Sequence, residues 1–166
     1  LTGLAHDSSA AVAYDPDANE QGLHARSLKL AALQRTLKTP EVFGDDTGEL
    51  LVIGWGSTKG AIEEAVTRVR AEGRRVSSLH LRFVNPMPSG LKEIMAGFDQ
   101  VMTVEGNWSD RPEDPIIDDD NRRYSALAML LRSRYLVDVD TWSEVGGQPI
   151  KPGRVQQAIE RKLTRR

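Results

Sequence analysis

The sequence contains no cysteine, few aromatic residues and no long apolar run. Without cysteine, the chain has no thiolate to hold an iron–sulfur cluster, to pair in a disulfide or to act as a nucleophile. Aromatic residues make up 5% of the chain, so few flat side chains are present for nucleic-acid bases to stack on. No apolar run approaches the roughly 18 residues of a membrane-spanning helix, and no basic-then-apolar leader is seen. We expect a cytoplasmic protein that contacts neither membrane nor nucleic acid.

A strong excess of one charge is also missing. The formal net charge is −2, which creates no general attraction for a polyanion. The length of 166 residues suits one domain, and 39% hydrophobic residues are enough to build its core. The three histidines are far apart in the sequence and match no metal-binding spacing, so no metal site is expected.

Short apolar runs and segments with helical spacing alternate along the chain. Strands are expected at residues 50–53, 76–84, 100–104 and 136–141. Helices are expected at residues 24–37, 61–69, 91–95, 124–131 and 155–163. Such alternation predicts a three-layer α/β/α sandwich around a mostly parallel sheet. Residues 1–47 are interpreted as an arm, extended up to residue 21, followed by a linker helix, and residues 48–166 as the α/β domain.

Three local patterns make more detailed predictions. Residues 124–131 are apolar on nearly every side, as expected of a helix buried deeply against a sheet. Ser89 follows a proline-rich break and is expected to cap the next short helix. In the second strand, Leu79, Leu81 and Phe83 alternate with polar residues, which predicts that one face of that strand is apolar.

The turn after the first strand is the most distinctive local motif. Gly54, Gly56, Ser57 and Thr58 stand between a buried strand and a helix, where free backbone amides favour an anion. One interpretation is structural, with glycines making the tight turn and Ser57 or Thr58 capping the helix. The alternatives are a contact to a partner or ligand, or a stand-alone anion- or nucleotide-binding module that uses these amides.

The region between residues 105 and 120 contains seven acids and a single base, Arg111. Such runs are usually solvated, but an acidic loop can also steer a charged partner, and both interpretations stay open. No nucleophile elbow, Walker loop or thiamine-diphosphate motif occurs in the sequence. We therefore assign no catalytic residue and no cofactor to this chain alone.

Several short segments, taken in order, carry a resemblance to a known family. They are Gly3-Leu4-x-His6-Asp7, Arg26-x-x-Lys29-Leu30, Gly54-Trp55-Gly56-Ser57-Thr58-x-Gly60, Leu79-His80-Leu81-Arg82, Asn85-Pro86-x-Pro88, Val104-Glu105-x-Asn107 and Leu127-Ala128-x-Leu130-Leu131-Arg132. This order resembles the α subunit of 2-oxoacid:ferredoxin oxidoreductases, in particular the 2-oxoglutarate enzyme. The chain departs from the family after Asn107, where an acidic stretch at 109–121 replaces a Gly-Gln-Leu-Ala helix start.

The resemblance implies a transketolase C-terminal-like fold, whose five-stranded sheet has one strand more than the periodicity predicts. It also implies an enzyme that decarboxylates a 2-oxoacid oxidatively to an acyl-CoA and reduces ferredoxin. Thiamine diphosphate, magnesium and iron–sulfur clusters are then expected elsewhere in the full complex. The implied partners are the preceding domains of the α chain, the β subunit and, through the assembly, ferredoxin.

Within that family, this chain is expected to be a structural and subunit-interface domain. The matching segments nominate His6, Asp7, Arg82, Glu105 and Asn107 as interface or substrate-side residues. His6 lies in an irregular arm, where simple solvent exposure is the alternative. Pyruvate or a branched-chain 2-oxoacid stays open as the substrate of the full enzyme.

Overall fold

Residues 3–164 are described in a computed structural model of the chain, and they form two compact units. One unit contains the residues up to Lys38 together with Phe83–Ser89, and the other contains Thr39–Arg82 with the residues from Gly90 onward. The boundary expected after residue 47 falls inside the second unit. Within residues 3–164, no helix combines the length and the apolar character needed to cross a bilayer.

The first unit is built on the helix α1 (Pro16–Thr36), which contains no buried residue. The prediction of an extended arm up to residue 21 was wrong. The helix starts at Pro16 because Asp15 is its N-cap and accepts a hydrogen bond from the amide of Ala18 at 2.8 Å, while proline suits the first helical position. Near its other end, Gln34 Nε2 donates to the carbonyl of Met87 at 2.9 Å, which links α1 to the proline-rich segment.

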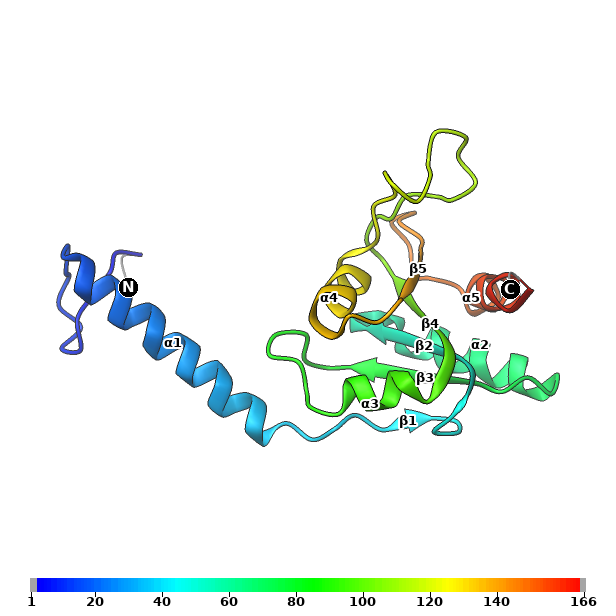
Figure 1. Cartoon of the computed structure of the whole chain (residues 1–166), viewed down its shortest axis with the longest axis horizontal. Coiled ribbons are helices and arrows are strands. Elements are labelled where there is room, and N and C mark those ends of the chain that lie inside the picture. Colours follow the sequence, from blue (N-terminus) through cyan, green and yellow to red (C-terminus); the bar gives the residue numbers. More distant parts are fainter. Residues whose placement is uncertain (1–2, 165–166) are drawn as a thin grey trace. The chain divides into compact units, whose positions relative to one another are not determined.

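The second unit contains a five-stranded sheet in the order β1-β3-β2-β4-β5 (Figure 1). The strands are β1 (Val42–Phe43), β2 (Gly48–Trp55), β3 (Val76–Leu81), β4 (Phe98–Glu105) and β5 (Asp140–Ser143). The helices are the 3-10 turn η1 (Gly56–Thr58), α2 (Lys59–Ala71), α3 (Leu91–Ala96), α4 (Ala126–Tyr135) and α5 (Pro152–Thr164). All neighbouring strands are parallel except β1, which runs antiparallel to β3. The predicted α/β sandwich with a mostly parallel sheet is confirmed.

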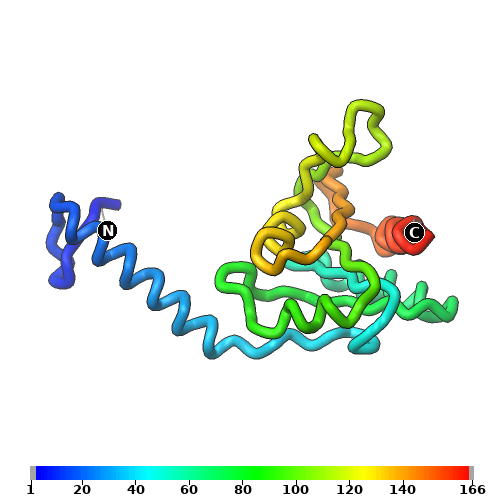
Figure 2. The backbone as a smooth tube through the Cα atoms, in the orientation of Figure 1, coloured from blue at the N-terminus to red at the C-terminus, as the bar shows by residue number. Residues whose placement is uncertain are grey.

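Helices cover both faces of this sheet. On one side, α2 and α5 pack against each other (Figure 2). The core cluster on this side includes Leu50, Val52 and Val104. Because side chains alternate along a strand, Leu51 and Ile53 point to the opposite face, where α3 and α4 lie. These four residues of β2 are at most 1% exposed, so the central strand is covered on both faces as its continuous apolar run predicts.

The strand β3 is also an inner strand, since it lies between β1 and β2. Leu79 and Leu81 are buried as predicted, but β3 ends at Leu81, so Phe83 lies outside the strand and is 42% exposed. Ser77 and Ser78 are buried as well, so the polar positions of the strand are not exposed. The buried hydroxyl of Ser77 is satisfied locally, because it donates to the carbonyl of Asp45 at 2.8 Å and accepts from the amide of Asp45 at 3.0 Å. A polar residue in a strand therefore does not mark an exposed position here.

Two other local predictions also fail. The short helix α3 is preceded by Gly90 rather than capped by Ser89; Gly90 has a φ of +85°, and a side chain there would meet Thr39. The helix α4 is not buried on all sides, because Met129 is 57% exposed and Leu130 is 47% exposed. Periodicity alone does not tell a buried helix from one with an uncovered apolar face.

One side-chain contact ties the start of β2 to the turn before β3. Glu49 accepts hydrogen bonds from the Arg74 guanidinium, the shortest at 2.9 Å, and from the amide of Arg75 at 3.0 Å. These hydrogen bonds, with the nearby positive charges, lower the pKa of Glu49 from 4.5 to about 2. Because the pKa falls on folding, the contact stabilises the folded chain above about pH 4.5, and the stabilisation is lost as the pH drops toward 2.

The substitution Glu49→Gln tests this contact. We expect the free energy of unfolding of the variant to depend less on pH between 4.5 and 2 than that of the wild type, because the titrating group is gone. The pair is partly solvent-exposed, so the difference should be about 1 kcal/mol or less. Urea titrations at several pH values measure it, with Glu64→Gln on the exposed side of α2 as control. Parallel pH curves for Glu49→Gln and wild type would contradict the assignment.

Candidate functional site

The carboxyl ends of β2, β3, β4 and β5 meet at one edge of the sheet, because these strands are parallel. The connection after β2 leads to β3 on one side, and the connection after β3 returns to β4 on the other side. Open α/β sheets bind ligands at such a switch point, in the crevice outside the strand ends. The edge next to β2 and β4 is therefore the first place to look for a site.

The predicted turn lies at this edge, where η1 follows β2. Gly54 is a packing residue, because a Cβ there would lie 2.2 Å from Ile62 Cδ1 and 2.6 Å from Thr58 Oγ1. Gly56 adopts a left-handed φ of +62°, which glycine reaches without strain. The predicted side-chain cap by Ser57 or Thr58 was wrong, since no such bond forms and the Thr58 hydroxyl donates to the carbonyl of Trp55 at 2.8 Å.

Glu105 ends β4 at the same edge and is fully buried. One carboxylate oxygen accepts hydrogen bonds from the amide of Leu127 at 2.9 Å and from Asn107 Nδ2 at 2.7 Å. The other accepts from the amide of Ala128 at 3.1 Å and from the hydroxyl of Ser125. A negative charge at a helix N-terminus is favoured by the free amides and the helix dipole. Glu105 therefore caps α4 from a neighbouring strand.

Asn107 completes this cap. Its Oδ1 accepts a hydrogen bond from the amide of Ala126 at 3.0 Å, while its Nδ2 donates to Glu105. Together the two side chains satisfy the first three amides of α4, which is why Ser125 makes no side-chain cap of its own. Both residues thus lie at the carboxyl edge of the sheet, and their polar groups face the start of α4.

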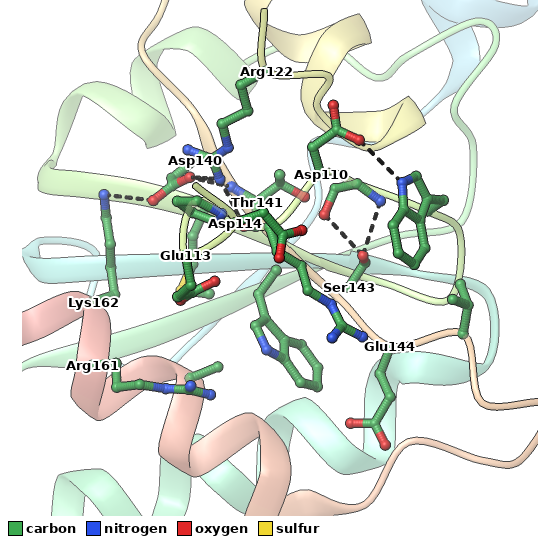
Figure 3. Close-up of a pocket in the computed structure, with 18 of the residues that line it drawn as sticks. Asp110, Glu113, Asp114, Arg122, Asp140, Thr141, Ser143, Glu144, Arg161 and Lys162 are labelled. Carbon is green, nitrogen blue, oxygen red and sulfur yellow. Dashed lines mark hydrogen bonds and ion pairs between the residues drawn. The ribbon is translucent and has the colours of Figure 1, made fainter. Parts of the chain in front are cut away.

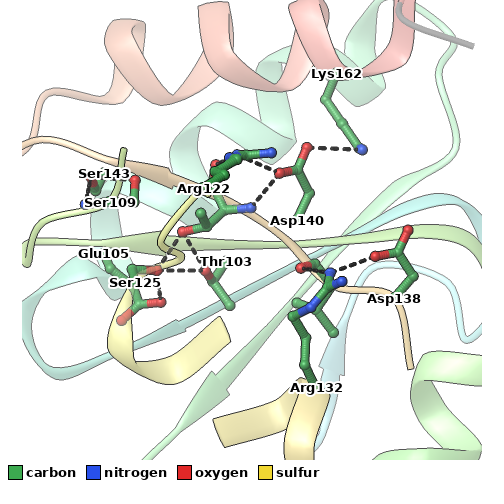
Figure 4. Close-up of polar contacts among 12 residues, drawn as sticks. Thr103, Glu105, Ser109, Arg122, Ser125, Arg132, Asp138, Asp140, Ser143 and Lys162 are labelled. Carbon is green, nitrogen blue, oxygen red and sulfur yellow. Dashed lines mark hydrogen bonds and ion pairs between the residues drawn. The ribbon is translucent and has the colours of Figure 1, made fainter. Parts of the chain in front are cut away.

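Buried hydroxyl groups surround the Glu105 carboxylate (Figure 4). Thr103 Oγ1 lies 3.1 Å from Thr141 Oγ1 and 3.4 Å from Ser125 Oγ, and Ser125 also contacts Thr141. The network joins β4, β5 and the start of α4. Polar groups buried together in this way favour a single arrangement when all of them are bonded.

The other predicted residues lie in different surroundings. Arg82 follows β3 at the same edge and is exposed. His6 and Asp7 belong to the first unit, where a pocket of about 570 Å³ brings them beside Arg26 and Lys29. Asp7 accepts hydrogen bonds from the hydroxyl and amide of Ser9, and these lower its pKa. His6, Asp7, Arg26 and Lys29 all belong to the matching segments, and all four line this one cavity.

A pocket that the sequence did not indicate lies between the acidic loop, β5 and α5 (Figure 3). It has a volume of about 660 Å³. On its wall, Asp140 accepts a hydrogen bond from Arg122 Nη2 at 2.9 Å and another from Lys162 Nζ at 3.0 Å. Burial alone would raise the pKa of Asp140, but the hydrogen bonds from Lys162 and from the amide of Thr141, with both positive charges, lower it.

The acidic loop is closed at its base by Asp110 and Arg123. Asp110 accepts hydrogen bonds from the guanidinium of Arg123 at 2.9 and 3.0 Å and from its amide at 2.9 Å, and Trp108 Nε1 donates to it at 3.2 Å. Within the loop, Asp118 accepts from the amides of Asp120 and Asn121. The loop therefore has hydrogen-bonded structure of its own, and one of its acids, Asp110, forms an ion pair with Arg123.

The carboxylates of Glu105 and Asp140 at this edge already accept hydrogen bonds from other residues of the chain. All four hydrogen bonds to Glu105 come from the chain itself, and Asp140 is shared by two cations. Among residues 3–164, no group of three or more histidine, cysteine, aspartate or glutamate side chains lies close enough to hold a metal ion. The contacts of Glu105 and Asp140 hold α4, β5 and α5 together at the carboxyl edge of the sheet.

Comparisons with known proteins point to one family. The family described as pyruvate:ferredoxin oxidoreductase core domain II matches residues 48–155. The chain is 34% identical over 146 residues to 2-oxoglutarate oxidoreductase subunit KorA of Mycobacterium tuberculosis, covering 86% of this chain and 19% of that protein. It is 28% identical over 168 residues to the α subunit of 2-oxoacid:ferredoxin oxidoreductase 2 of Aeropyrum pernix, covering 98% and 24%. The chain thus spans about a fifth to a quarter of these relatives.

Solved structures agree on the fold. The 2-oxoglutarate:ferredoxin oxidoreductase of Magnetococcus marinus superposes with a TM-score of 0.75 at 24% identity, covering 98% of this chain and 26% of that chain. A split-gene transketolase, described as an inactive β4 tetramer, gives a TM-score of 0.53 at 20% identity, covering 76% and 41%. The transketolase-like fold that the resemblance implies is therefore confirmed.

Two glycine substitutions test the packing at the turn. We expect Gly54→Ala to destabilise the chain by about 1–3 kcal/mol, because the new methyl group meets Ile62 and Thr58. Gly60→Ala, six residues later in α2, meets no atom within 4 Å and should stabilise the chain by roughly 0.5–1 kcal/mol. Urea denaturation of both variants measures this. Equal effects for the pair would show that packing does not select glycine at position 54.

The substitution Glu105→Ala tests the cap on α4. It leaves buried amides and a hydroxyl without their acceptor, so we expect a loss of about 3 kcal/mol in the free energy of unfolding. The matched control is Glu64→Ala, which removes an exposed carboxylate paired with Arg68 and should change stability by about 0.5 kcal/mol or less. A loss no larger than that of the control would refute the capping role.

Proposed function

This chain belongs to the pyruvate:ferredoxin oxidoreductase core domain II family, and from this we propose that it is a structural and subunit-interface domain of a 2-oxoglutarate:ferredoxin oxidoreductase α subunit. The complete enzyme would decarboxylate 2-oxoglutarate oxidatively, pass electrons to ferredoxin and form an acyl-CoA. Its thiamine diphosphate would supply the group that accepts the substrate carbon. This chain would support the domains that hold it.

The choice of 2-oxoglutarate follows from the relatives. The protein of Mycobacterium tuberculosis and the structure of Magnetococcus marinus are both described as 2-oxoglutarate enzymes. The Aeropyrum pernix relative is described only by the wider class of 2-oxoacids. Pyruvate and branched-chain 2-oxoacids are therefore the competing substrates for the complete enzyme.

The residues of this chain do not fit the cofactors of such an enzyme. Iron–sulfur clusters need thiolates, and the sequence has no cysteine. Magnesium needs several oxygen ligands together, and among residues 3–164 no three or more histidine, aspartate or glutamate side chains lie close enough to hold a metal ion. We infer that thiamine diphosphate, magnesium and the clusters are bound by other domains or subunits, including the β subunit.

The observation that supports the structural role is that polar side chains at the carboxyl edge of the sheet are bonded to the chain itself. In open α/β sheets this edge usually binds the ligand. Here, Glu105 and Asn107 give their polar groups to the N-terminus of α4, and Gly54 is used for packing. Side chains that hold the fold in this way support a scaffold function, with contacts to the rest of the α chain and to the β subunit on the outer surfaces.

The proposal is tested by comparing the chain alone with the complete enzyme. Isothermal titration calorimetry with thiamine diphosphate and magnesium should give no binding heat for the chain alone and saturable binding for the complete α and β subunits. Ferredoxin reduction by the complete enzyme should be fastest with 2-oxoglutarate, with pyruvate and a branched-chain 2-oxoacid as comparisons.

Two results would contradict this proposal. Saturable binding of thiamine diphosphate by the chain alone would contradict the proposed scaffold role. Localised amide NMR shifts at Gly56–Lys59 on titration with nucleotides or coenzyme A would favour the stand-alone anion-binding module instead.

A further inference from the structure

The helix α4 presents a face without charge to the outside. Ala126, Met129, Leu130 and Ser133 are all exposed, and their spacing places them within one stripe of the helix. Met129 is 57% exposed and Leu130 is 47% exposed. The opposite stripe, with Leu127, Ala128 and Leu131, is buried against the sheet.

The other long helices of this unit have polar outer faces. The exposed residues of α2 include Lys59, Glu64 and Arg68, and those of α5 include Gln157 and Arg161. Surface helices normally expose charged and polar side chains opposite the face that packs on the core. A helix that is apolar on two opposite sides is typical of one covered from both sides.

Hydrogen bonds at both ends of α4 fix the rotation of the helix, so its outer stripe does not turn toward the sheet. Glu105 binds the amides of Leu127 and Ala128, and Asn107 binds the amide of Ala126. At the other end, Arg132 Nη1 donates to the carbonyl of Val139 at 2.9 Å. Both ends of the helix are thereby fixed, so Met129 and Leu130 stay on the outer side of the helix.

We propose that the outer face of α4 packs against an apolar surface of the same α subunit that lies outside these 166 residues. The inference rests on the proposed function, under which this chain is one domain of a larger subunit. The chain spans 19% of the Mycobacterium tuberculosis relative and 26% of the Magnetococcus marinus chain, so most of such a subunit remains to supply that surface. Arg134 is exposed beside the stripe, so the covering surface should offer an acceptor at its border.

Thiol labelling tests this packing directly. The chain has no cysteine, so Met129→Cys introduces its single thiol, and the rate of reaction with a maleimide reports how often position 129 is uncovered. Mass spectrometry of the tryptic peptide 124–132 allows the same measurement in the complete α subunit. We expect labelling at least about tenfold slower in the complete α subunit than in the chain, which corresponds to the site being covered for about nine-tenths of the time.

The matched control is Ile116→Cys. Ile116 is 82% exposed on the acidic loop and is not part of α4, so its labelling rate should be the same in the chain and in the complete subunit. Equal rates for Met129→Cys in both would overturn the proposal. Protection that appears only when the β subunit is added, or already in the chain as it dimerises at high concentration, would also overturn it, because the covering surface would belong to another molecule.

This result is separable from a failure of the proposed function. Ferredoxin reduction by the complete enzyme is measured independently, and labelling of the α subunit does not require activity. An inactive enzyme with a protected position 129 would refute the proposed reaction and keep the packing. An active enzyme with an unprotected position 129 would keep the reaction and refute the packing.

Discussion

The hydrogen bonds between the buried carboxylate of Glu105 and the first turn of α4 organise the carboxyl edge of this sheet. A buried carboxyl group is costly unless its oxygens are satisfied, and four donors from the chain satisfy them here. The same contacts fix the position of α4, which in turn determines which of its faces is buried and which is exposed. The edge that would bind a ligand in many α/β proteins is thus used to build the fold.

Much of the sheet unit could be predicted from the sequence because the signals are local. The apolar run of β2 and the helical spacing in α2 and α5 depend on neighbouring residues only. The errors occur where distant parts of the chain decide the outcome. The strand β1 has two residues and forms by pairing with β3, and this pairing makes β3 an inner strand of the sheet. The helix α1 is a different case, because its start signal at Asp15 and Pro16 is local and lies in the sequence itself.

The candidate site shows the same limit. The turn at Gly54, together with Glu105 and Asn107, was found as a set of matching segments, but the task of Glu105 depends on amides 22 and 23 residues further along the chain. The pair of cations on Asp140 joins residues 18 and 22 positions away, and no local pattern indicates it. Motifs therefore nominated these residues for inspection, whereas the contacts that they make required the tertiary structure.

The measurement that tests this account most directly is native-state hydrogen exchange of the Leu127 and Ala128 amides, followed by NMR in the chain alone. If Glu105 caps α4, these two amides should exchange only in rare opening events, although first-turn amides of a helix have no partner within the helix. Their protection should be unchanged when a 2-oxoacid or thiamine diphosphate is added. Rapid exchange in the free chain, or protection that appears only with such a ligand, would show that the carboxylate serves a binding site instead.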